Sequence, residues 1–466
     1  MIARLLAGAA LLAVAGCTVG PNYRLPDKAI INSAPAKGPL AKDNPVITAQ
    51  DLPARWWHLY DDPVLDRLEE QALAGNTDLR MAMANLARAQ ALTAAAKGAN
   101  EPEFSIDAAA QRARLSGESY LQPTSIPVYN LDNTGAQMSY QFDLFGRFRR
   151  GVEAAKADQQ ATEALVDATK VTLAAQVARA YIEVCAAHEF SAIVDQQVEV
   201  QEKILEIQRR MLEEGKGSAL EVSVAQARLA EAKARLPLDE IHAKAGLYRL
   251  AFLLGRAPSD YPREAEACQH LPALSRPLPV GDGAALLARR PDVRAAERQL
   301  AAATAQIGVA TAELYPQVGF FTSGGTTGFI KDIAEAAASR WGIGALIHWN
   351  FPTTGARAKV RVARIDTDRA LTRFDATVLS ALREVETAAN TYAQNHDRLL
   401  LLTQSRQAAE QAADQIRRLK QAGRAPAQAS LGGVDAMLAT RAREQETREA
   451  LAQDQITLFL ALGGGW

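Results

Sequence analysis

The chain is poor in the residues from which most enzyme and metal sites are built. It has only 3 cysteines, none arranged as Cys-x-x-Cys, and only 6 histidines, none of which lies one helical turn from another. This excludes zinc ribbons and dithiol redox motifs. A phosphate-binding loop, a dinucleotide fingerprint and a nucleophile elbow are also absent from the sequence. We therefore expect no enzyme, no catalytic residue, no metal and no soluble cofactor.

An excess of positive charge is missing too. Lys and Arg total 52 while Asp and Glu total 53, so the formal net charge is −1. Nucleic-acid binding takes much of its affinity from basic residues that neutralise phosphates, so we expect no nucleic-acid partner. Aromatic residues are only 6%, but 48% of residues are hydrophobic and 23% are charged, which is typical of a folded chain.

The N-terminus has the pattern of a targeting segment. Arg4 precedes an apolar run and then small residues, which predicts a lipoprotein signal peptide over 1–16 that is too short to span a membrane. Residues 14–17 read Val-Ala-Gly-Cys and match a bacterial lipobox, so we expect a covalent lipid on Cys17. Thr18, where an Asp would resemble an inner-membrane retention signal, favours the outer membrane. An ordinary signal peptide is the alternative.

The other two cysteines are far apart in the sequence. Cys185 lies in a helical run and is interpreted as a small buried hydrophobic residue. A disulfide between Cys185 and Cys268 is left open.

The sequence is duplicated. Asp78 and Asp292 lie in similar segments 214 positions apart, and Gly215 and Gly423 lie in similar segments 208 positions apart. The chain therefore divides into an N-terminal arm and equatorial segment (17–61), a first repeat (62–256), a Pro-rich equatorial linker (257–282) and a second repeat (283–466). The offset rises to 211 at Leu431, which predicts about three extra residues over 425–430.

Each repeat has the same predicted elements. In order these are a helix (62–98 and 283–313), two strands with period-two alternation (104–110 with 136–142, and 318–320 with 343–351), a long helix (147–213 and 356–422) and a shorter helix (218–255 and 430–462). A helix of about 67 residues would be about 100 Å long. The fold class is therefore mainly α with a small β part, a long antiparallel helical wall with a hairpin at one end.

The alternating strands have two possible interpretations. Their apolar alternation, with Tyr120, Tyr129, Tyr315, Trp341 and Trp349 nearby, resembles transmembrane β-segments with an aromatic girdle. A pair of soluble hairpins that cap a helical bundle is the alternative. In lipid a wall of strands must close, and four strands cannot do so. Transmembrane strands would therefore require an oligomer.

Several motifs together resemble the trimeric outer-membrane efflux channels of the TolC/OprM family, in particular its NodT-type lipoprotein branch. These stretches are 17–23 (CTVGPNY), Trp56-Trp57 with Asp62-Pro63 and Leu68, 140–147 (YQFDLFGR), 289–297 (RRPDVRAAE), 312–317 (AELYPQ) and 462–466 (LGGGW). They span nearly the whole mature chain in the family's order. The resemblance implies a homotrimer with a shared twelve-stranded barrel, a helical coiled-coil barrel in the periplasm and a belt built from 18–60, 257–282 and the C-terminus.

The resemblance also implies a function. It is that of a passive export duct for small toxic molecules, anchored in outer-membrane lipid of a Gram-negative bacterium and joined by a periplasmic adaptor (a membrane fusion protein) to an inner-membrane pump of the RND type. A duct for type I protein secretion and a lipid-anchored periplasmic coiled-coil scaffold are the alternatives.

Candidate site residues follow from the same resemblance. Asp435 matches a carboxylate that closes the periplasmic end of family members, while Met437 and Leu438 replace the family's Gln-Arg, so Arg441 is a second gate candidate. The glycines at the two helix turns are explained first as helix caps. Their second interpretation is a docking surface for the adaptor, with these candidates: Gly215, Lys216, Gly217, Gly423 and Arg424.

Overall fold

The computed structural model describes residues 18–40, 47–48, 50, 52–118, 121, 123–274 and 277–464. The chain divides into two compact units, and each unit takes segments from both repeats. Unit 1 comprises Met1–Pro26, Leu86–Thr162 and Ala296–Phe374, and unit 2 comprises Asp27–Asn85, Glu163–Ala295 and Asp375–Trp466. None of the described helices is both long enough and apolar enough to cross a membrane.

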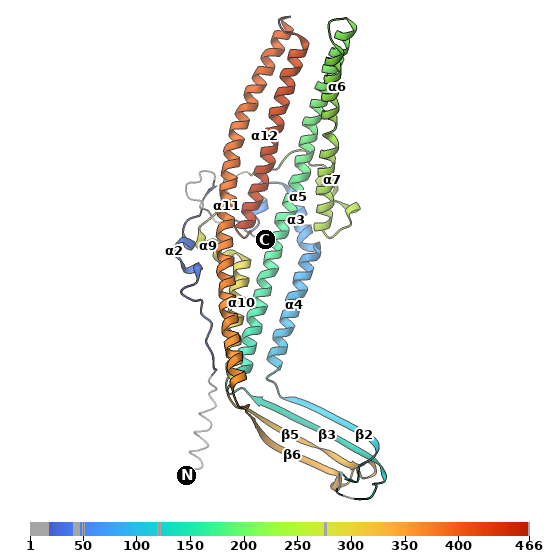
Figure 1. Cartoon of the computed structure of the whole chain (residues 1–466), viewed down its shortest axis with the longest axis vertical. Coiled ribbons are helices and arrows are strands. Elements are labelled where there is room, and N and C mark those ends of the chain that lie inside the picture. The colour runs from blue at the N-terminus through green and yellow to red at the C-terminus, as the bar shows by residue number, and fades with distance from the viewer. Residues whose placement is uncertain are drawn as a thin grey trace. The chain divides into compact units, whose positions relative to one another are not determined.

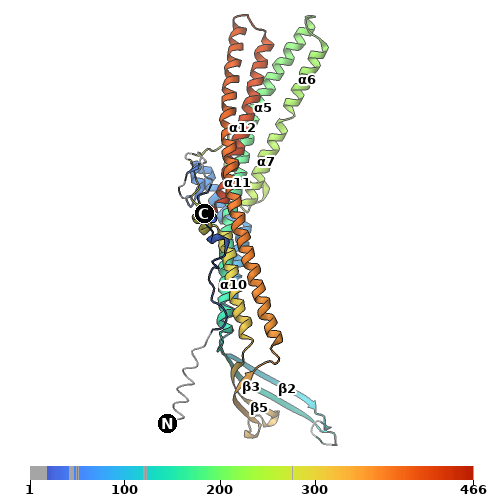
Figure 2. The same cartoon turned by 60° about the vertical axis from the view of Figure 1, so that its left-hand side comes forward.

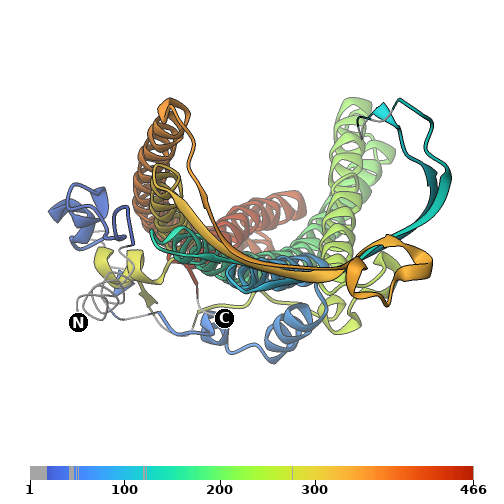
Figure 3. The ribbon, with the colours of Figure 1, turned by 90° about the horizontal axis from the view of Figure 1, so that it is seen from below.

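Unit 1 contains a four-stranded antiparallel sheet (Figure 1). Its strands, in spatial order, are β2 (Glu103–Arg114), β3 (Val128–Phe142), β5 (Gln317–Phe329) and β6 (Ser339–His348). Each repeat supplies one hairpin, and β3 and β5 join the two hairpins through pairs such as Ala136 with Gly324. The sheet is curved (Figure 3). The short helices η5 (Ile330–Asp332) and η6 (Ala336–Ala338) lie in the β5–β6 loop.

Helices make up most of the remainder of unit 1 and most of unit 2. They are α3 (Pro63–Gly75), α4 (Thr77–Gly98), α5 (Arg147–Glu213), α6 (Ala219–Lys233), α7 (Leu236–Leu253), α9 (Gly283–Arg289), α10 (Pro291–Ala312), α11 (Thr354–Gln421) and α12 (Ala427–Ala461). The shorter elements of unit 2 are η1 (Ile30–Asn32), α2 (Ala34–Lys37), β1 (Ile47–Thr48), η2 (Trp56–Tyr60), η4 (Pro258–Asp260), α8 (Arg263–Glu266) and β4 (Leu278–Pro279).

The two long helices are confirmed almost to the residue. The predictions of 147–213 and 356–422 correspond to α5 at Arg147–Glu213 and α11 at Thr354–Gln421. Neither helix contains a proline, and proline is the residue that would break its hydrogen-bond ladder.

Three other helices were predicted as continuous, and these predictions are wrong. The helix over 62–98 is interrupted at Asn76, whose backbone is extended and whose Oδ1 accepts a hydrogen bond from Leu79 N at 2.9 Å. The helix over 283–313 is interrupted at Arg290, because Pro291 disfavours helical backbone in the residue before it. The helix over 218–255 is interrupted just before Pro237, which lies in the first turn of α7.

Two smaller predictions also need correction. Helices α6 and α12 begin at Ala219 and Ala427, and α7 and α12 end at Leu253 and Ala461, so the offset of 208 holds throughout. The three extra residues over 425–430 are therefore not present. Strand β6 ends at His348 rather than at residue 351.

Within unit 2, the arm contacts both of the other segments that were expected to build a belt with it. Strand β1 of the arm pairs in parallel with β4 of the Pro-rich segment, with Ile47 opposite Leu278. Trp56, which is 1% exposed, stacks on Phe459 of α12 with ring centroids 4.5 Å apart. The arm thus packs against both the linker and the C-terminal helix.

Glu69 on α3 is an acidic residue buried in the interior of unit 2. Its side chain is fully buried, and neither carboxylate oxygen has a hydrogen-bond partner in the part of the chain that the structure describes. Burial, and then the nearby Asp66 carboxylate, raises the pKa of Glu69 well above its usual range. The folded state therefore binds the Glu69 proton more tightly than the unfolded state does.

This makes stability depend on pH in a defined direction. Because the pKa of Glu69 is higher in the folded state, the free energy of unfolding falls as pH rises from the usual value of 4.5 through the folded pKa. Glu69→Gln removes the titration, so its thermal midpoint should change less with pH and exceed that of the wild type at alkaline pH. The adjacent, exposed Glu70→Gln is the control. If the thermal midpoints of Glu69→Gln and the wild type changed equally with pH, the prediction would be contradicted.

Candidate functional sites on the sheet and at the helix turns

The sheet has one apolar and one polar face. Paired residues lie on the same face of a sheet, so Phe104 of β2 shares a face with Ile343 of β6, and Ile106 shares it with Trp341. These four side chains are 64–82% exposed. The opposite face carries mostly polar side chains: Glu103, Ser105, Asp107, Gln111, Asn133, Gln137, Ser139, Gln141, Gln317, Ser323, Thr327, Arg340 and His348.

This alternation is what a wall of strands between lipid and water requires. A large, contiguous apolar surface is costly in water. The outer edges of β2 and β6 have no strand partner among the described residues. In lipid such edges must be paired, so the sheet is incomplete as a membrane wall by itself.

The N-terminal arm is fastened to unit 1 just beyond the predicted lipid site. Cys17 itself lies outside the described residues. From residue 18 onward the arm packs on α5, where Arg150 donates from Nε to Val19 O at 3.2 Å and from Nη2 to Gly20 O at 3.1 Å and to Asn22 Oδ1 at 2.9 Å. Arg150 is 3% exposed. The residue expected to carry lipid thus directly precedes a fixed segment of the unit that contains the sheet.

The two helix–helix turns lie at the same end of unit 2 (Figures 1 and 2) and have the same backbone geometry. Gly215 and Gly423 have φ of 72° and 70°, a left-handed conformation that favours glycine. Lys216 N donates to Met211 O at 2.7 Å, and Arg424 N donates to Leu419 O at 2.8 Å, which closes each helix in the same way. All five predicted docking residues therefore lie at these two turns, and Gly217 is the one that is partly buried.

The two turns differ in charge. At the first turn Lys216 pairs with Glu214 at 2.8 Å. At the second turn Arg418, Lys420 and Arg424 are exposed and form no ion pair with any described residue. The second turn therefore presents uncompensated positive charge.

The gate candidates are not brought together within one chain. Asp435 is partly buried and Arg441 is exposed, and neither has an ion-pair partner in the described ranges. The replacements for the family's Gln-Arg have a structural role instead. Leu438 is 1% exposed and packs with Ile193, Val200 and Ala442, and Met437 packs against the same cluster. Apolar packing between α12 and α5 thus occupies the place expected for polar links.

A buried charged network, which the sequence did not indicate, lies further along α12. Glu444 is 2% exposed and accepts hydrogen bonds from Arg406 of α11, from Thr403 Oγ1 at 3.0 Å and from Arg448 at 2.7 Å. Burial favours the neutral acid, but these donors outweigh it and lower the pKa of Glu444. The network holds α11 and α12 together as a pair.

The apolar cluster gives a prediction for the α5–α12 contact. Leu438→Ala should destabilise unit 2 by about 3 kcal/mol, because it leaves a cavity in a packed site. Met437→Ala, at a partly exposed position of the same cluster, should cost less. Denaturant unfolding followed by tryptophan fluorescence measures both. Equal effects of the two substitutions would contradict the burial argument.

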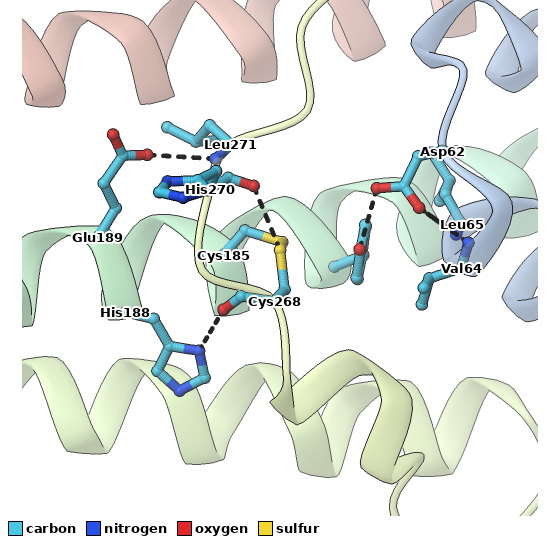
Figure 4. Close-up of a disulfide and its surroundings, with 10 residues drawn as sticks. Asp62, Val64, Leu65, Cys185, His188, Glu189, Cys268, His270 and Leu271 are labelled. Atoms are coloured by element: carbon cyan, nitrogen blue, oxygen red, sulfur yellow. Dashed lines mark hydrogen bonds between the residues drawn. A yellow bond between two sulfur atoms is a disulfide. The ribbon is translucent and has the colours of Figure 1, made fainter.

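A disulfide links α5 to the Pro-rich segment (Figure 4). Cys185, which was interpreted as a buried hydrophobic residue with its pairing left open, is fully buried and bonded to Cys268. The His188 ring donates from Nδ1 to Cys268 O at 2.8 Å, and Leu271 N donates to Glu189 Oε2 at 3.1 Å. One covalent bond and two hydrogen bonds therefore fix this segment on α5. No cluster of possible metal ligands occurs among the described residues.

Known proteins resemble this chain over most of its length. The family profile described as "Outer membrane efflux protein" matches residues 68–256 and 284–464. The pyoverdine export outer membrane protein OpmQ of Pseudomonas putida is 30% identical over 90% of each chain. Nodulation protein T of Rhizobium leguminosarum bv. trifolii is 26% identical over 81% of this chain and 79% of its own length.

Solved structures of outer-membrane channels share the fold of this chain. The solved structure of the outer-membrane channel OprN is 33% identical, with a TM-score of 0.85 over 97% of this chain and 100% of that chain. The CmeC outer membrane channel of Campylobacter jejuni is 20% identical, again with a TM-score of 0.85, over 97% of this chain and 95% of that chain, and it shows the fold alone. The internally duplicated, mainly helical fold with a small sheet is thereby confirmed.

Proposed function

Since this chain belongs to the outer membrane efflux protein family, we propose that it is the passive outer-membrane duct of a tripartite efflux system that exports small toxic molecules. The observation that carries the proposal is the sheet of unit 1. It has an exposed apolar face, a polar opposite face and two edges that pair with no strand among the described residues. Such a sheet suits a lipid-embedded wall around water. The sequence has no catalytic constellation, so the duct carries out no reaction.

The duct is a homotrimer. Four strands cannot close around a lumen, and known membrane barrels begin near eight strands. Three copies supply twelve strands, so that β6 of each copy pairs with β2 of the next. Closed cyclic symmetry satisfies both edges of every sheet with a single kind of contact.

Two partner proteins complete the efflux system: one supplies the energy for transport and the other docks on this chain. The sequence carries no nucleotide-binding motif, so an inner-membrane pump of the RND type drives transport. A periplasmic adaptor docks at the two turns, where Gly215, Lys216, Gly217, Gly423 and Arg424 are gathered at one end of unit 2. Arg418, Lys420 and Arg424, which pair with no acidic residue in the described segments, suit an acidic partner surface. Asp435 and Arg441 remain the gate candidates between the turns and the belt.

Cys17 carries the lipid that adds to membrane attachment. The hydrogen bonds from Arg150 fix residues 19–22, which follow Cys17, in the unit that contains the sheet. This supports a lipid inserted beside the strands. Labelling cells with radioactive palmitate should mark the wild type but not Cys17→Ser. Label on Cys17→Ser would contradict the lipidation site.

The duct itself is tested in two steps. Detergent extracts of outer membranes should yield a heat-resistant oligomer of trimer size that forms ion-conducting pores in planar bilayers. Deletion of the gene should sensitise its host to a panel of solvents and antibiotics, and restored expression should reverse this. A monomer that leaves bilayers silent would favour a periplasmic scaffold, and loss of a secreted protein without any sensitisation would favour type I secretion.

A further inference from the structure

Arg340 lies at the start of β6, on the polar face of the sheet, and its side chain is held flat across the neighbouring strands. Its Nε donates to Thr327 Oγ1 on β5 at 2.8 Å, and its Nη2 donates to Asn133 Oδ1 on β3 at 3.0 Å. Thr327 Oγ1 in turn donates to the same Asn133 oxygen at 3.1 Å. Residues from three strands thus fix the position of one guanidinium group.

The two strand positions next to Arg340 in its row of paired residues are glycines, which have no side chain. Asp107, Gly135, Gly325 and Arg340 form one row of paired residues across the four strands. A Cβ atom on Gly135 would lie 2.9 Å from Arg340 Nη2, closer than such atoms approach in proteins. Gly135 therefore leaves the space that the guanidinium occupies, and Gly325 lets the backbones of β3 and β5 approach closely in the same row.

The charge of Arg340 is not neutralised where it lies. Its side-chain partners are a neutral hydroxyl and a neutral amide oxygen, and it forms no ion pair within the described part of the chain. It is the sole Lys or Arg on the polar face of these four strands, because Arg112 and Arg114 lie on the opposite face. Glu103 and Asp107 of β2 are the acidic residues on the same face, and Asp107 is at the other end of the row.

We propose that Arg340 is a specificity-determining residue that favours anionic cargo, such as small carboxylate-bearing molecules, in the strand-lined part of the duct. The inference rests on the proposed function, in which the polar faces of three sheets line one water-filled lumen. Three guanidinium groups then lie at one level of that lumen. Their field extends over the Debye length, about 8 Å at physiological ionic strength and about 30 Å at 0.01 M salt. The carboxylate of Asp107, on the same face, favours cations instead.

The test is the ion selectivity of the full-length, lipid-bearing protein in planar bilayers under a KCl gradient. Arg340→Gln should raise the permeability ratio of K⁺ to Cl⁻ about twofold at low salt, and the difference should vanish near 1 M KCl, where the Debye length is about 3 Å. Arg340→Lys, which retains the charge, should stay near the wild type. Arg112→Gln, the same change on the opposite face, should leave the ratio unchanged.

A second variant covers the case in which Arg340→Gln does not assemble. Asn133→Asp has nearly the same shape and places a carboxylate beside the guanidinium, so it should shift the ratio in the same direction as Arg340→Gln. Pores in which neither substitution changes the ratio, or in which Arg112→Gln changes it equally, would overturn this inference alone. A wild-type protein that forms no pores would overturn the proposed function and this inference with it.

Discussion

Loss of the Cys185–Cys268 disulfide is expected to lower the stability of unit 2 by about 4 kcal/mol. The bond joins residues separated by 83 positions, so it closes a long loop and removes many conformations from the unfolded chain. The native contacts around it survive its loss, because Glu189 still accepts from Leu271 N, and Lys244 of α7 still pairs with Glu266 at 2.9 Å. The effect should therefore appear in unfolding rather than in the folded structure.

The variant that isolates this effect is Cys185→Ala/Cys268→Ala. Its denaturation midpoint in guanidinium chloride should be lower than that of the wild type and should not respond to reductant, whereas reductant should lower the wild-type midpoint to a similar value. Protease cleavage within 257–282 should also be faster in the reduced protein. Equal midpoints for the oxidised wild type and the double variant would show that the bond contributes nothing to stability.

Much of the fold could be predicted because local rules decide it. The absence of proline over 147–213 and 356–422 sets the length of α5 and α11. Alternation at Phe104 and Ile106 identifies a two-faced strand, because successive side chains point to opposite faces. The turns at Gly215 and Gly423 follow from the left-handed backbone that glycine permits.

What could not be predicted depends on residues distant in sequence. Nothing local to Cys185 indicates that Cys268 lies beside it. Nothing local to Glu444 indicates that Arg406 of α11 and Arg448 satisfy its buried carboxylate. The same applies to Arg340, whose partners lie on two other strands. The proposed gate is a further case, since Asp435 was identified by resemblance and forms no ion pair with the residues that the structure describes.

The repeat has a structural consequence at its two helix breaks. In the first repeat, Asn76 precedes α4 and donates from Nδ2 to Leu253 O, near the end of α7, at 2.9 Å. In the second repeat, Arg290 precedes α10 and donates from Nη1 to Ala461 O, at the end of α12, at 2.7 Å. The two acceptors are 208 positions apart, so different side chains make the same connection in each repeat.

Arg290 makes more contacts than Asn76 does. It also pairs with Asp292 at 2.7 Å and with Glu384 of α11 at 2.8 Å, and it is 7% exposed. It therefore joins the start of α10, the end of α12 and the middle of α11. Removal of the Arg290 side chain leaves the buried carbonyl of Ala461 and two carboxylates without this partner. We expect this to lower the free energy of unfolding by more than the loss of a single hydrogen bond does.

Arg290→Met should consequently destabilise unit 2 by about 3 kcal/mol, and Asn76→Ala by about 1 to 2 kcal/mol. Arg290→Lys should recover only part of the loss, because an ammonium group cannot reproduce the forked geometry of a guanidinium. Arg294→Met, four residues further on in the first turns of α10, is the matched control. Its side chain is 44% exposed and pairs with Asp167 at 2.8 Å, so it should cost less than about 1 kcal/mol. Equal unfolding midpoints for Arg290→Met and Arg294→Met would mean that Arg290 does not join these helices energetically.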